Sequence, residues 1–502
     1  MHEHLFNPGR FTVLRWRRAI ACGAVLLGGA SAAVYAWSAK AEMTGVAPAM
    51  VVPASLQPTD ALPPIVAVPF TGDLELRNRL DATSALFVSG EKLHGDLLRQ
   101  FYARHNFERV WPTRQTQADA LLQTIMRAGE QGLDPDMFHA ATLRTGAALS
   151  PLDRELLLSD AFLSYADALA RGVLPIEERM DDEDLTPEPV DVAATLDNAI
   201  ASPNPGAIIE ALAPNSPNYV ALRRALAAYR ASSPTIPLDG ARGAGVPRAR
   251  PVERVDDSRL RQIIVNLERQ RWLPRTLPAD RIWVNIPDAH LTLYRDDKPT
   301  FMTRVVVGEV DRQTPELQST ITSLLFNPPW NIPPSIAKEE ILPKIAAQPD
   351  YLARHHMQYR HNGAIQQLPG PGSALGQLKF EMANRFDVYL HDTPLKNLFG
   401  RDNRNQSHGC VRVQNPRELA SLVSGIPVDT INKEIGTNAT HRRMLGSSIP
   451  VFIVYQTAFA EADGRIEFRP DVYSRDDEIW QKLHPSAQAP VAEHELQGQR
   501  RG

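Results

Sequence analysis

The spacing of the apolar residues changes at Ile282, and this change most limits what the 502-residue chain can fold into. Before Ile282 the apolar positions recur every three or four residues, as on one face of a helix. The clearest example of that spacing is Leu93, Leu97, Leu98, Phe101 and Tyr102. From Ile282 onward the apolar residues alternate with period two, which indicates half-buried strands. Because the first spacing is typical of helices and the second of strands, we predict an α+β chain, with a helical domain followed by a mainly β domain.

Breaks in these patterns divide the chain into seven parts. They are a signal peptide or membrane anchor at 1–42, a linker at 43–74, a helical scaffold domain at 75–231, a second linker at 232–256, a connecting helix at 257–281, the mainly β domain at 282–458 with a helical lid at about 333–380, and a C-terminal extension and tail at 459–502. Within them we expect helices at 117–131, 152–171 and 217–230, and strands at 319–326, 386–391 and 450–456.

The N-terminal segment has the features of an export signal. Arg15, Arg17 and Arg18 precede an almost uncharged run at 19–37, and Ala39-Lys40-Ala41 resembles a small-residue cleavage site. The run is long for a cleaved signal and just long enough to span a bilayer, so cleavage and anchoring both stay open. In either case the positive residues before the run favour placing the rest of the chain outside the cytoplasm.

Cysteine and charge content narrow the class of protein further. The two cysteines are Cys22, in the apolar N-terminal run, and Cys410, so no disulfide within a domain is expected. An exported chain that keeps one unpaired thiol needs a reason for it, although a buried cysteine can also serve simply as a small hydrophobe. The net charge of −4 gives no sign of a nucleic-acid-binding surface.

The stretch 386–413 carries the candidate chemistry. His408 stands two residues before Cys410, and His391 stands nineteen before it at the end of an apolar strand. A neighbouring imidazole or positive charge raises the thiolate fraction of a cysteine, and a thiolate can attack a carbonyl to form a thioester. In an extended segment His408 and Cys410 point the same way, whereas His391 reaches the thiol only if its strand is adjacent. The backbone N–H groups of Gly409 and Cys410 are candidate oxyanion donors.

Each of these residues also has a purely structural interpretation. His391 can be a structural hydrogen-bond donor, Ser407 a turn residue, and Arg412 the partner of a carboxylate. The segment Asn415-Pro416-Arg417-Glu418 is explained as a helix start with a capping box. A metal site built from Cys410, His391 and His408 would need Asp392 as its fourth ligand, since structural zinc sites usually have four.

The string Ser407-His408-Gly409-Cys410-Val411-Arg412 resembles the signature of the L,D-transpeptidase catalytic domain, and His391 stands where that family has its upstream histidine. Further matches follow in the family's order: Gly370-Pro371-Gly372, Leu375-Gly376, Asn384, Tyr389-Leu390-His391-Asp392-Thr393-Pro394, Phe399 and Arg404. Residues 327–333, Tyr351-Leu352 and the helical N-terminal half resemble the large Gram-negative subgroup with a capping insertion. The resemblance covers roughly residues 80–480.

This resemblance implies a mechanism without metal or organic cofactor. Cys410 attacks the carbonyl at the L-centre of diaminopimelate in a donor tetrapeptide and expels D-Ala, and the amine of a neighbouring stem resolves the thioester. His391 is the general base, oriented by the carbonyl of Asp392, while His408 and Gly409 shape the site and the oxyanion hole. The residues implied to contact substrate are Tyr389, Trp330, Arg412, Ser407, Asp392 and Phe399. Penem-type β-lactams commonly acylate the cysteine of this family.

The resemblance also implies a periplasmic enzyme whose partners are peptidoglycan stems, and the inner membrane if the N-terminal segment is uncleaved. An outer-membrane lipoprotein lysine as acceptor, a stem-cutting endopeptidase and a catalytically silent wall-binding scaffold are the alternatives. The order of His391 before Cys410 argues against a papain-like endopeptidase fold. Two departures stand out: residues 232–256 are too few for the small peptidoglycan-binding domain usual in this subgroup, and Ser373 stands where the family commonly has Asn.

Overall fold

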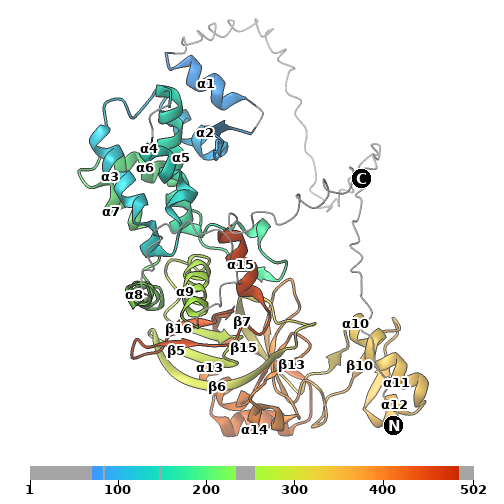
Figure 1. The fold of residues 1–502 in the computed structure, drawn as a ribbon. Helices are drawn as coiled ribbons and strands as arrows, with labels where there is room; N and C mark the ends of the chain where they lie inside the picture. The colour runs from blue at the N-terminus through green and yellow to red at the C-terminus, as the bar shows by residue number, and fades with distance from the viewer. Residues whose placement is uncertain (1–70, 83–84, 146–148, 233–254, 485–502) are drawn as a thin grey trace, which may run out of the picture. The chain divides into compact units, whose positions relative to one another are not determined.

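A computed structural model describes residues 71–82, 85–145, 149–232 and 255–484 of the chain (Figure 1). The predicted signal or anchor at 1–42, most of both predicted linkers and the tail at 485–502 lie outside these residues. Within the described ranges, no helix has both the length and the apolar character needed to cross a bilayer.

The first half of the described chain is helical, as the apolar spacing predicts. Its helices are α1 (Leu74–Asp81), α2 (Gly95–Arg104), α3 (Gln115–Met126), α4 (Ala140–Thr145), α5 (Pro151–Arg171), α6 (Val192–Ile200), α7 (Pro205–Glu210) and α8 (Pro217–Ser232). A short hairpin, β1 (Phe87–Val88) and β2 (Glu91–Lys92), precedes α2.

Helix α5 is the central element of this helical domain. Ser150 caps its first turn by accepting the N–H of Asp153, and Pro151 occupies the first helical position. Side chains all around the helix are buried, so it contributes to the domain core over most of its length. The expected helix at 152–171 is therefore confirmed.

The second half is built on a sheet of ten strands. The strands are β3 (Glu183–Asp184), β4 (Arg281–Asn285), β5 (His290–Arg295), β6 (Lys298–Gly308), β7 (Glu316–Phe326), β11 (Leu378–Met382), β12 (Leu390–His391), β13 (Asn405–Ser407), β14 (Val411–Val413) and β15 (His441–Val454). Their order is β11-β12-β14-β6-β5-β4-β15-β7-β3, and β13 pairs with β6 outside this path. Because β7 also pairs with β11, the sheet closes on itself around an apolar interior.

Three elements from distant parts of the chain join this sheet to its surroundings. The connecting helix α9 (Val255–Arg271) and the C-terminal helix α15 (Arg475–Leu483) pack on each other, and their apolar side chains share one core with β15. Strand β3 lies in the helical half of the sequence, yet it pairs in parallel with the start of β7. The residues after 458, expected only as an extension, also form a hairpin of β16 (Ala458–Ala460) and β17 (Ile466–Phe468).

The expected lid is a separate small unit between β7 and β11. It contains α10 (Pro334–Ile336), α11 (Leu342–Ala347) and α12 (Tyr351–Arg354), with a single π-helical turn before α11. It also contains a three-stranded sheet of β8 (Trp330–Asn331), β9 (Met357–Tyr359) and β10 (Ile365–Gln367), so it is not purely helical. Its apolar residues form their own cluster around Ile332, Ile336 and Tyr351. The predicted end at about 380 is too late, because Leu378 already begins a strand of the main sheet.

The predicted α+β organisation is confirmed, but the expected strand at 386–391 is shorter than predicted. Only Leu390 and His391 are in strand conformation. Asn384 ends the extended run, because its side-chain oxygen accepts the N–H groups of Phe386 and Val388 at 3.1 and 3.2 Å. The chain therefore turns at 384–388, with Asp387 in a left-handed conformation, before it enters β12.

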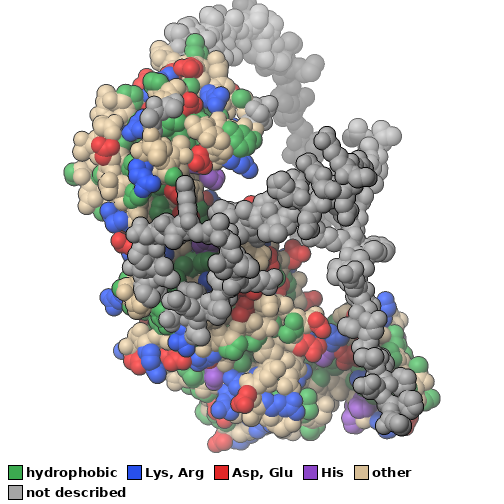
Figure 2. Space-filling view, in the orientation of Figure 1, with side chains coloured by type: hydrophobic (Ala, Val, Ile, Leu, Met, Phe, Trp, Pro, Cys, Tyr) green, Lys and Arg blue, Asp and Glu red, His purple; other side chains and the backbone are tan. Residues whose placement is uncertain are grey.

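Two helices, α13 (Pro416–Ser424) and α14 (Val428–Gly436), complete the second half. Pro416 begins α13 as expected, but the Asn415 side chain makes no capping hydrogen bond, so the predicted capping box is wrong. On the face shown in Figure 2, acidic and basic side chains are interspersed over the described surface, in keeping with the nearly balanced composition.

Candidate active site

Cys410 and His391 belong to neighbouring segments of the sheet. Strand β12 pairs in parallel with β14, with Leu390 opposite Val411 and His391 opposite Arg412. Leu390 and Val411 point into the barrel core, so Tyr389, His391, Cys410 and Arg412 belong to the opposite face. The N–H of Val411 donates to the carbonyl of Tyr389 at 3.1 Å, which fixes this register next to the cysteine.

The thiol of Cys410 lies against the turn that precedes β12. Its Sγ is 4.0 Å from the carbonyl oxygen of Asp387, the residue that the Asn384 turn places there. The hydroxyl and the backbone N–H of Tyr389 both interact with the same sulfur. The Tyr389 ring also meets the His391 ring edge-on, with centroids 5.6 Å apart, so Tyr389 contacts both candidate catalytic groups.

The His391 imidazole is buried and held in one orientation. Its Nδ1 lies 2.5 Å from the carbonyl oxygen of Asp392, and since a carbonyl can only accept, Nδ1 carries the proton. Nε2 is then left as the acceptor in the neutral ring. Burial, and next the charge of Arg412, lower the pKa of His391 to about 3, so the ring is neutral at physiological pH.

The electrostatics of Cys410 differ from the expected thiolate-promoting environment. Burial raises the pKa of the Cys410 thiol, and the Tyr389 N–H and the charges of Lys379 and Arg412 offset this only in part. The resting pair is therefore a neutral thiol and a neutral imidazole. The expectation considered the neighbouring charges, which favour the thiolate, but not the loss of hydration, which opposes it.

The segment 408–410 is a turn between β13 and β14, and not the extended segment that would align His408 with Cys410. His408 Nε2 instead lies 2.5 Å from Oε1 of Glu340, on the insertion. Gly409 has φ of +105°, which favours glycine. Its N–H donates to the hydroxyl oxygen of Ser407 at 3.2 Å. The prediction that this N–H is a free oxyanion donor is therefore wrong. The Cys410 N–H makes no hydrogen bond to any described residue.

Two of the expected substrate contacts are structural. The Ser407 side chain is buried, and its hydroxyl donates to the Cys410 carbonyl at 2.6 Å, which braces the turn from inside. Phe399 is also buried and packs with Val306 and Leu398. Neither side chain is accessible to a ligand, and sequence alone did not distinguish them from exposed residues of the same motif.

Of the remaining expected contacts, Trp330 and Arg412 lie near the thiol, whereas Asp392 lines a different cavity. Trp330 is half-buried and hydrogen-bonds to the Tyr389 side chain. Arg412 is half-buried and stands opposite His391 in the pairing of β14 with β12. Asp392 pairs with Lys396 at 2.6 Å and lines a separate cavity of about 340 Å³. Ser373, which replaces the family's Asn, is buried, and its hydroxyl has no partner among the described residues.

A larger cavity, of about 570 Å³, adjoins the turn beside the thiol. It is lined by Tyr389 and Asp387 together with Lys379, Glu381 and Arg442. Glu381 pairs with Arg442, whereas Lys379 makes no ion pair within the described part of the chain. The Lys379 ammonium instead stands 3.7 Å from the centroid of the Tyr389 ring.

The sequence interpretation missed Lys379, although a signal was present. Leu378, Phe380 and Met382 alternate as core residues, so Lys379 and Glu381 had to lie on the opposite face of that strand. Lys379 also pairs in the sheet with His391.

The described residues offer little for the metal alternative. They contain no group of three or more His, Cys, Asp or Glu side chains arranged to hold a metal ion. His408 is turned toward Glu340, so it does not complete a ligand set with Cys410 and His391. The arrangement instead suits nucleophilic attack by the thiol on a bound carbonyl.

Comparisons with known proteins agree with both halves of the chain. Residues 279–452 match the L,D-transpeptidase catalytic domain (YkuD), and residues 96–226 match the Scaffold domain. A Haemophilus influenzae protein named "Putative L,D-transpeptidase" is 34% identical over 241 residues, which are 43% of this chain and 48% of that protein. The chain thus aligns with about half the length of this curated relative.

Similar solved structures include the catalytic domain of an E. faecium L,D-transpeptidase acylated by ertapenem. It is 14% identical, with a TM-score of 0.20, and the match covers 36% of this chain and 99% of that one. L,D-transpeptidase 3 from Mycobacterium tuberculosis, in complex with a faropenem-derived adduct, is 15% identical with a TM-score of 0.19. That match covers 36% of this chain and 62% of the other.

Proposed function

Since residues 279–452 are an L,D-transpeptidase catalytic domain and residues 96–226 a Scaffold domain, we propose that this protein cross-links peptidoglycan stems through a thioester on Cys410. The observation that carries the proposal is the parallel pairing of β12 with β14, which brings His391 and Cys410 to one face of the sheet. Asp387 and Tyr389, which lie against the thiol, line a cavity large enough for a peptide segment.

The first half-reaction begins from the neutral pair. As Sγ of Cys410 bonds to the carbonyl carbon, the thiol proton passes to Nε2 of His391, because Nδ1 already holds its proton against Asp392. The resulting imidazolium gives that proton to the leaving amine as the carbon–nitrogen bond breaks, and D-Ala departs. The pKa of the thiol is raised and that of the imidazole is lowered. Both shifts disfavour a thiolate–imidazolium ion pair before the reaction, so the proton moves to His391 during the attack.

The second half-reaction reverses these roles. The acceptor amine attacks the thioester carbon and loses its proton to His391, and the sulfur leaves and is reprotonated from the imidazolium. In both half-reactions negative charge develops on the carbonyl oxygen. The Cys410 N–H, which makes no hydrogen bond to any described residue, can donate to that oxygen and stabilise the charge. Gly409 is not assigned this role, since its N–H already serves Ser407.

The cavity beside the turn is the proposed place of the donor stem. Tyr389, which hydrogen-bonds to Trp330, lines the cavity near the thiol, and Lys379 supplies a half-buried cation without a carboxylate partner among the described residues. In a tetrapeptide donor, the carboxylate of the departing D-residue lies three bonds from the carbonyl carbon under attack. Because the charge of Lys379 is close enough to affect the Cys410 pKa, we assign Lys379 to that carboxylate.

The acceptor is proposed to be the amine of a second stem, in the periplasm, after export by the segment at 1–42. Attachment of an outer-membrane lipoprotein through a lysine uses the same donor half-reaction and is the second candidate. A silent wall-binding scaffold is disfavoured because the nucleophile and the base lie on one face beside a cavity.

The test compares cell-wall fragments by mass spectrometry from cells with the natural chain and with Cys410→Ala. We expect cross-links between two diaminopimelate residues to disappear in the variant. Loss of a peptidoglycan-linked lipoprotein, with these cross-links unchanged, would instead select the second candidate. In vitro, the folded protein should gain one penem adduct, and Cys410→Ala should gain none; an unlabelled natural protein would refute the thioester chemistry.

A further inference from the structure

The loop between β6 and β7, residues 309–315, lies directly behind the Gly409 peptide. The Thr314 hydroxyl donates to the Gly409 carbonyl oxygen at 2.8 Å and accepts the N–H of Gly308 at 2.8 Å. A Cβ on Gly409 would stand 3.3 Å from the carbonyl oxygen of Gln313, so the loop and the turn are in close contact. The Gly409 carbonyl and the Cys410 N–H belong to one planar peptide group, so the direction of that N–H depends on this loop.

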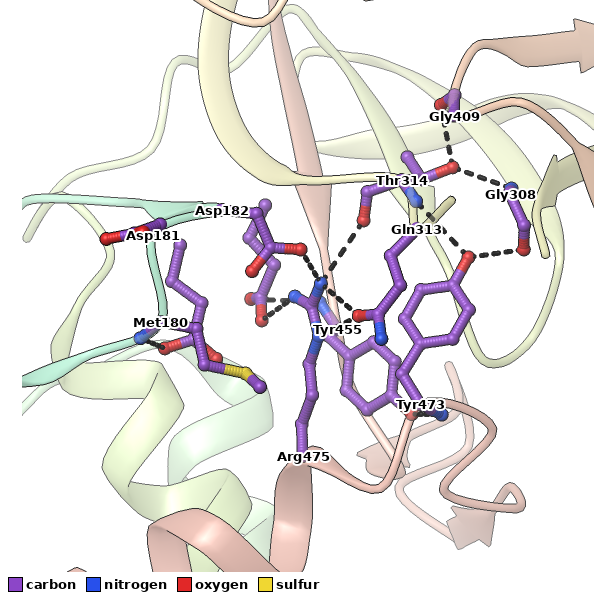
Figure 3. Close-up of polar contacts among 12 residues, drawn as sticks. Met180, Asp181, Asp182, Gly308, Gln313, Thr314, Gly409, Tyr455, Tyr473 and Arg475 are labelled. Carbon is purple, nitrogen blue, oxygen red and sulfur yellow. Dashed lines mark hydrogen bonds and ion pairs between the residues drawn. The ribbon is translucent and has the colours of Figure 1, made fainter. Parts of the chain in front are cut away.

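Two buried side chains from the C-terminal region hold the far side of the loop (Figure 3). Tyr473 donates its hydroxyl to the Gly308 carbonyl at 2.6 Å and accepts the N–H of Thr314 at 3.3 Å. Arg475 has a fully buried guanidinium, which donates to the Gln313 side-chain oxygen at 2.8 and 3.1 Å and to Glu316 at 3.1 Å. The loop is thus bound at both ends and at its middle.

The same guanidinium is also bound from the helical half of the chain. Nη2 of Arg475 pairs with the carboxylate of Asp182, which lies just before β3 (Figure 3). The Asp182 carbonyl accepts the N–H of Glu316 at 2.8 Å, so Asp182 is held next to the loop by the backbone as well. Hydrogen bonds therefore link Asp182 through Arg475 to the Gln313 side chain, and the adjacent residue Thr314 bonds to the Gly409 carbonyl.

We propose that Asp182, Arg475 and Thr314 are positioning residues, which aim the Cys410 N–H at the oxygen of the carbonyl under attack. None of them touches substrate; they act through the loop at 309–315. The inference rests on the proposed thioester chemistry and adds to it a role for the helical domain. An oxyanion donor contributes about 10²- to 10³-fold to rate, and a misplacement of about 1 Å can remove much of that.

The test uses two reagents that place different demands on Cys410. A penem must form a tetrahedral oxyanion before it acylates the thiol, whereas iodoacetamide alkylates the thiol by displacement and forms no oxyanion. Full-length Thr314→Val should be acylated by the penem at least about tenfold more slowly than the natural protein, while its alkylation rate changes less than about twofold. Thr314→Ser keeps the hydroxyl and should restore acylation.

A matched pair tests the contribution of the helical domain. Asp182→Ala removes the carboxylate partner that the helical half supplies to Arg475, and Asp181→Ala removes an equal charge from the adjacent exposed residue. We expect several-fold slower penem acylation with unchanged alkylation for Asp182→Ala, and natural rates for Asp181→Ala. Melting temperatures, measured in parallel, show that each variant is folded at the assay temperature.

The outcomes separate this inference from the proposed function. If the natural protein is acylated and Thr314→Val and Asp182→Ala match it, the positioning role is refuted alone. If both reagents slow equally in those variants, the loop acts on general access or stability, and the inference is also refuted. If the natural protein is alkylated but never acylated by the penem, the proposed function fails first, and this inference with it.

Discussion

Replacement of Lys379 by methionine should remove most of the preference of the enzyme for a donor with a free terminal carboxylate. Methionine keeps the length and apolar contacts of the side chain over the Tyr389 ring but lacks the charge. Two unit charges about 4 Å apart attract each other by about 4 kcal/mol at an effective dielectric constant of about 20. Lost hydration offsets part of this, which leaves about 1.5–3 kcal/mol for a charged hydrogen bond. The expected loss in kcat/KM is therefore about 10- to 100-fold.

The assay compares a tetrapeptide donor with its C-terminal amide, using the natural protein, Lys379→Met and Lys379→Arg. The natural protein and Lys379→Arg should favour the free carboxylate, whereas Lys379→Met should use both donors about equally. Loss of the Lys379 charge also raises the pKa of Cys410, so both donors should react somewhat more slowly with this variant. An unchanged ratio of the two donors in Lys379→Met would refute the assignment, even if the absolute rates fell.

Four further outcomes follow from the site. His391→Asn should lower kcat by about 10²- to 10⁴-fold, with penem acylation as the measure, while iodoacetamide still alkylates the folded variant at pH 9. Because burial raises the pKa of Cys410, alkylation of the natural protein should keep rising through pH 8.5, and a plateau below pH 8 would contradict this. With the His391 pKa lowered to about 3, kcat/KM should show no acidic limb near pH 6.5. Replacing residues 333–368 by a short linker should shift products from cross-links to free tripeptides, because water then reaches the thioester; unchanged product ratios would refute the lid.

The sequence best predicted the elements in which the apolar repeat continues over many residues. The 21-residue helix α5 and strand β7 show clear 3.6- and 2-residue repeats and were predicted close to their true bounds, whereas the strand expected at 450–456 begins at His441. The strand expected at 386–391 was overextended because apolar residues continue through it, while the side-chain hydrogen bonds of Asn384 turn the backbone. Such local competition leaves no periodic signal.

The C-terminal extension was the least predictable part. The sequence was expected to form only an extension there, yet Arg475 is fully buried, and Asp476 is buried against Arg269 of the connecting helix. Burial of these charges depends on partners far away in sequence, at positions 182, 269 and 316. The burial of Phe399 and Ser407 was likewise missed, since a motif fixes residue types and not the direction of each side chain.

The pairing of β3 with β7 has a consequence for how the enzyme can be produced. A fragment that starts at α9 would leave the first backbone groups of β7 without their neighbouring strand, and Arg475 without its aspartate. An open strand edge beside an apolar core invites pairing with other chains, so we expect such a fragment to aggregate. Expression boundaries for crystallisation or inhibitor screening should therefore begin upstream of Asp182.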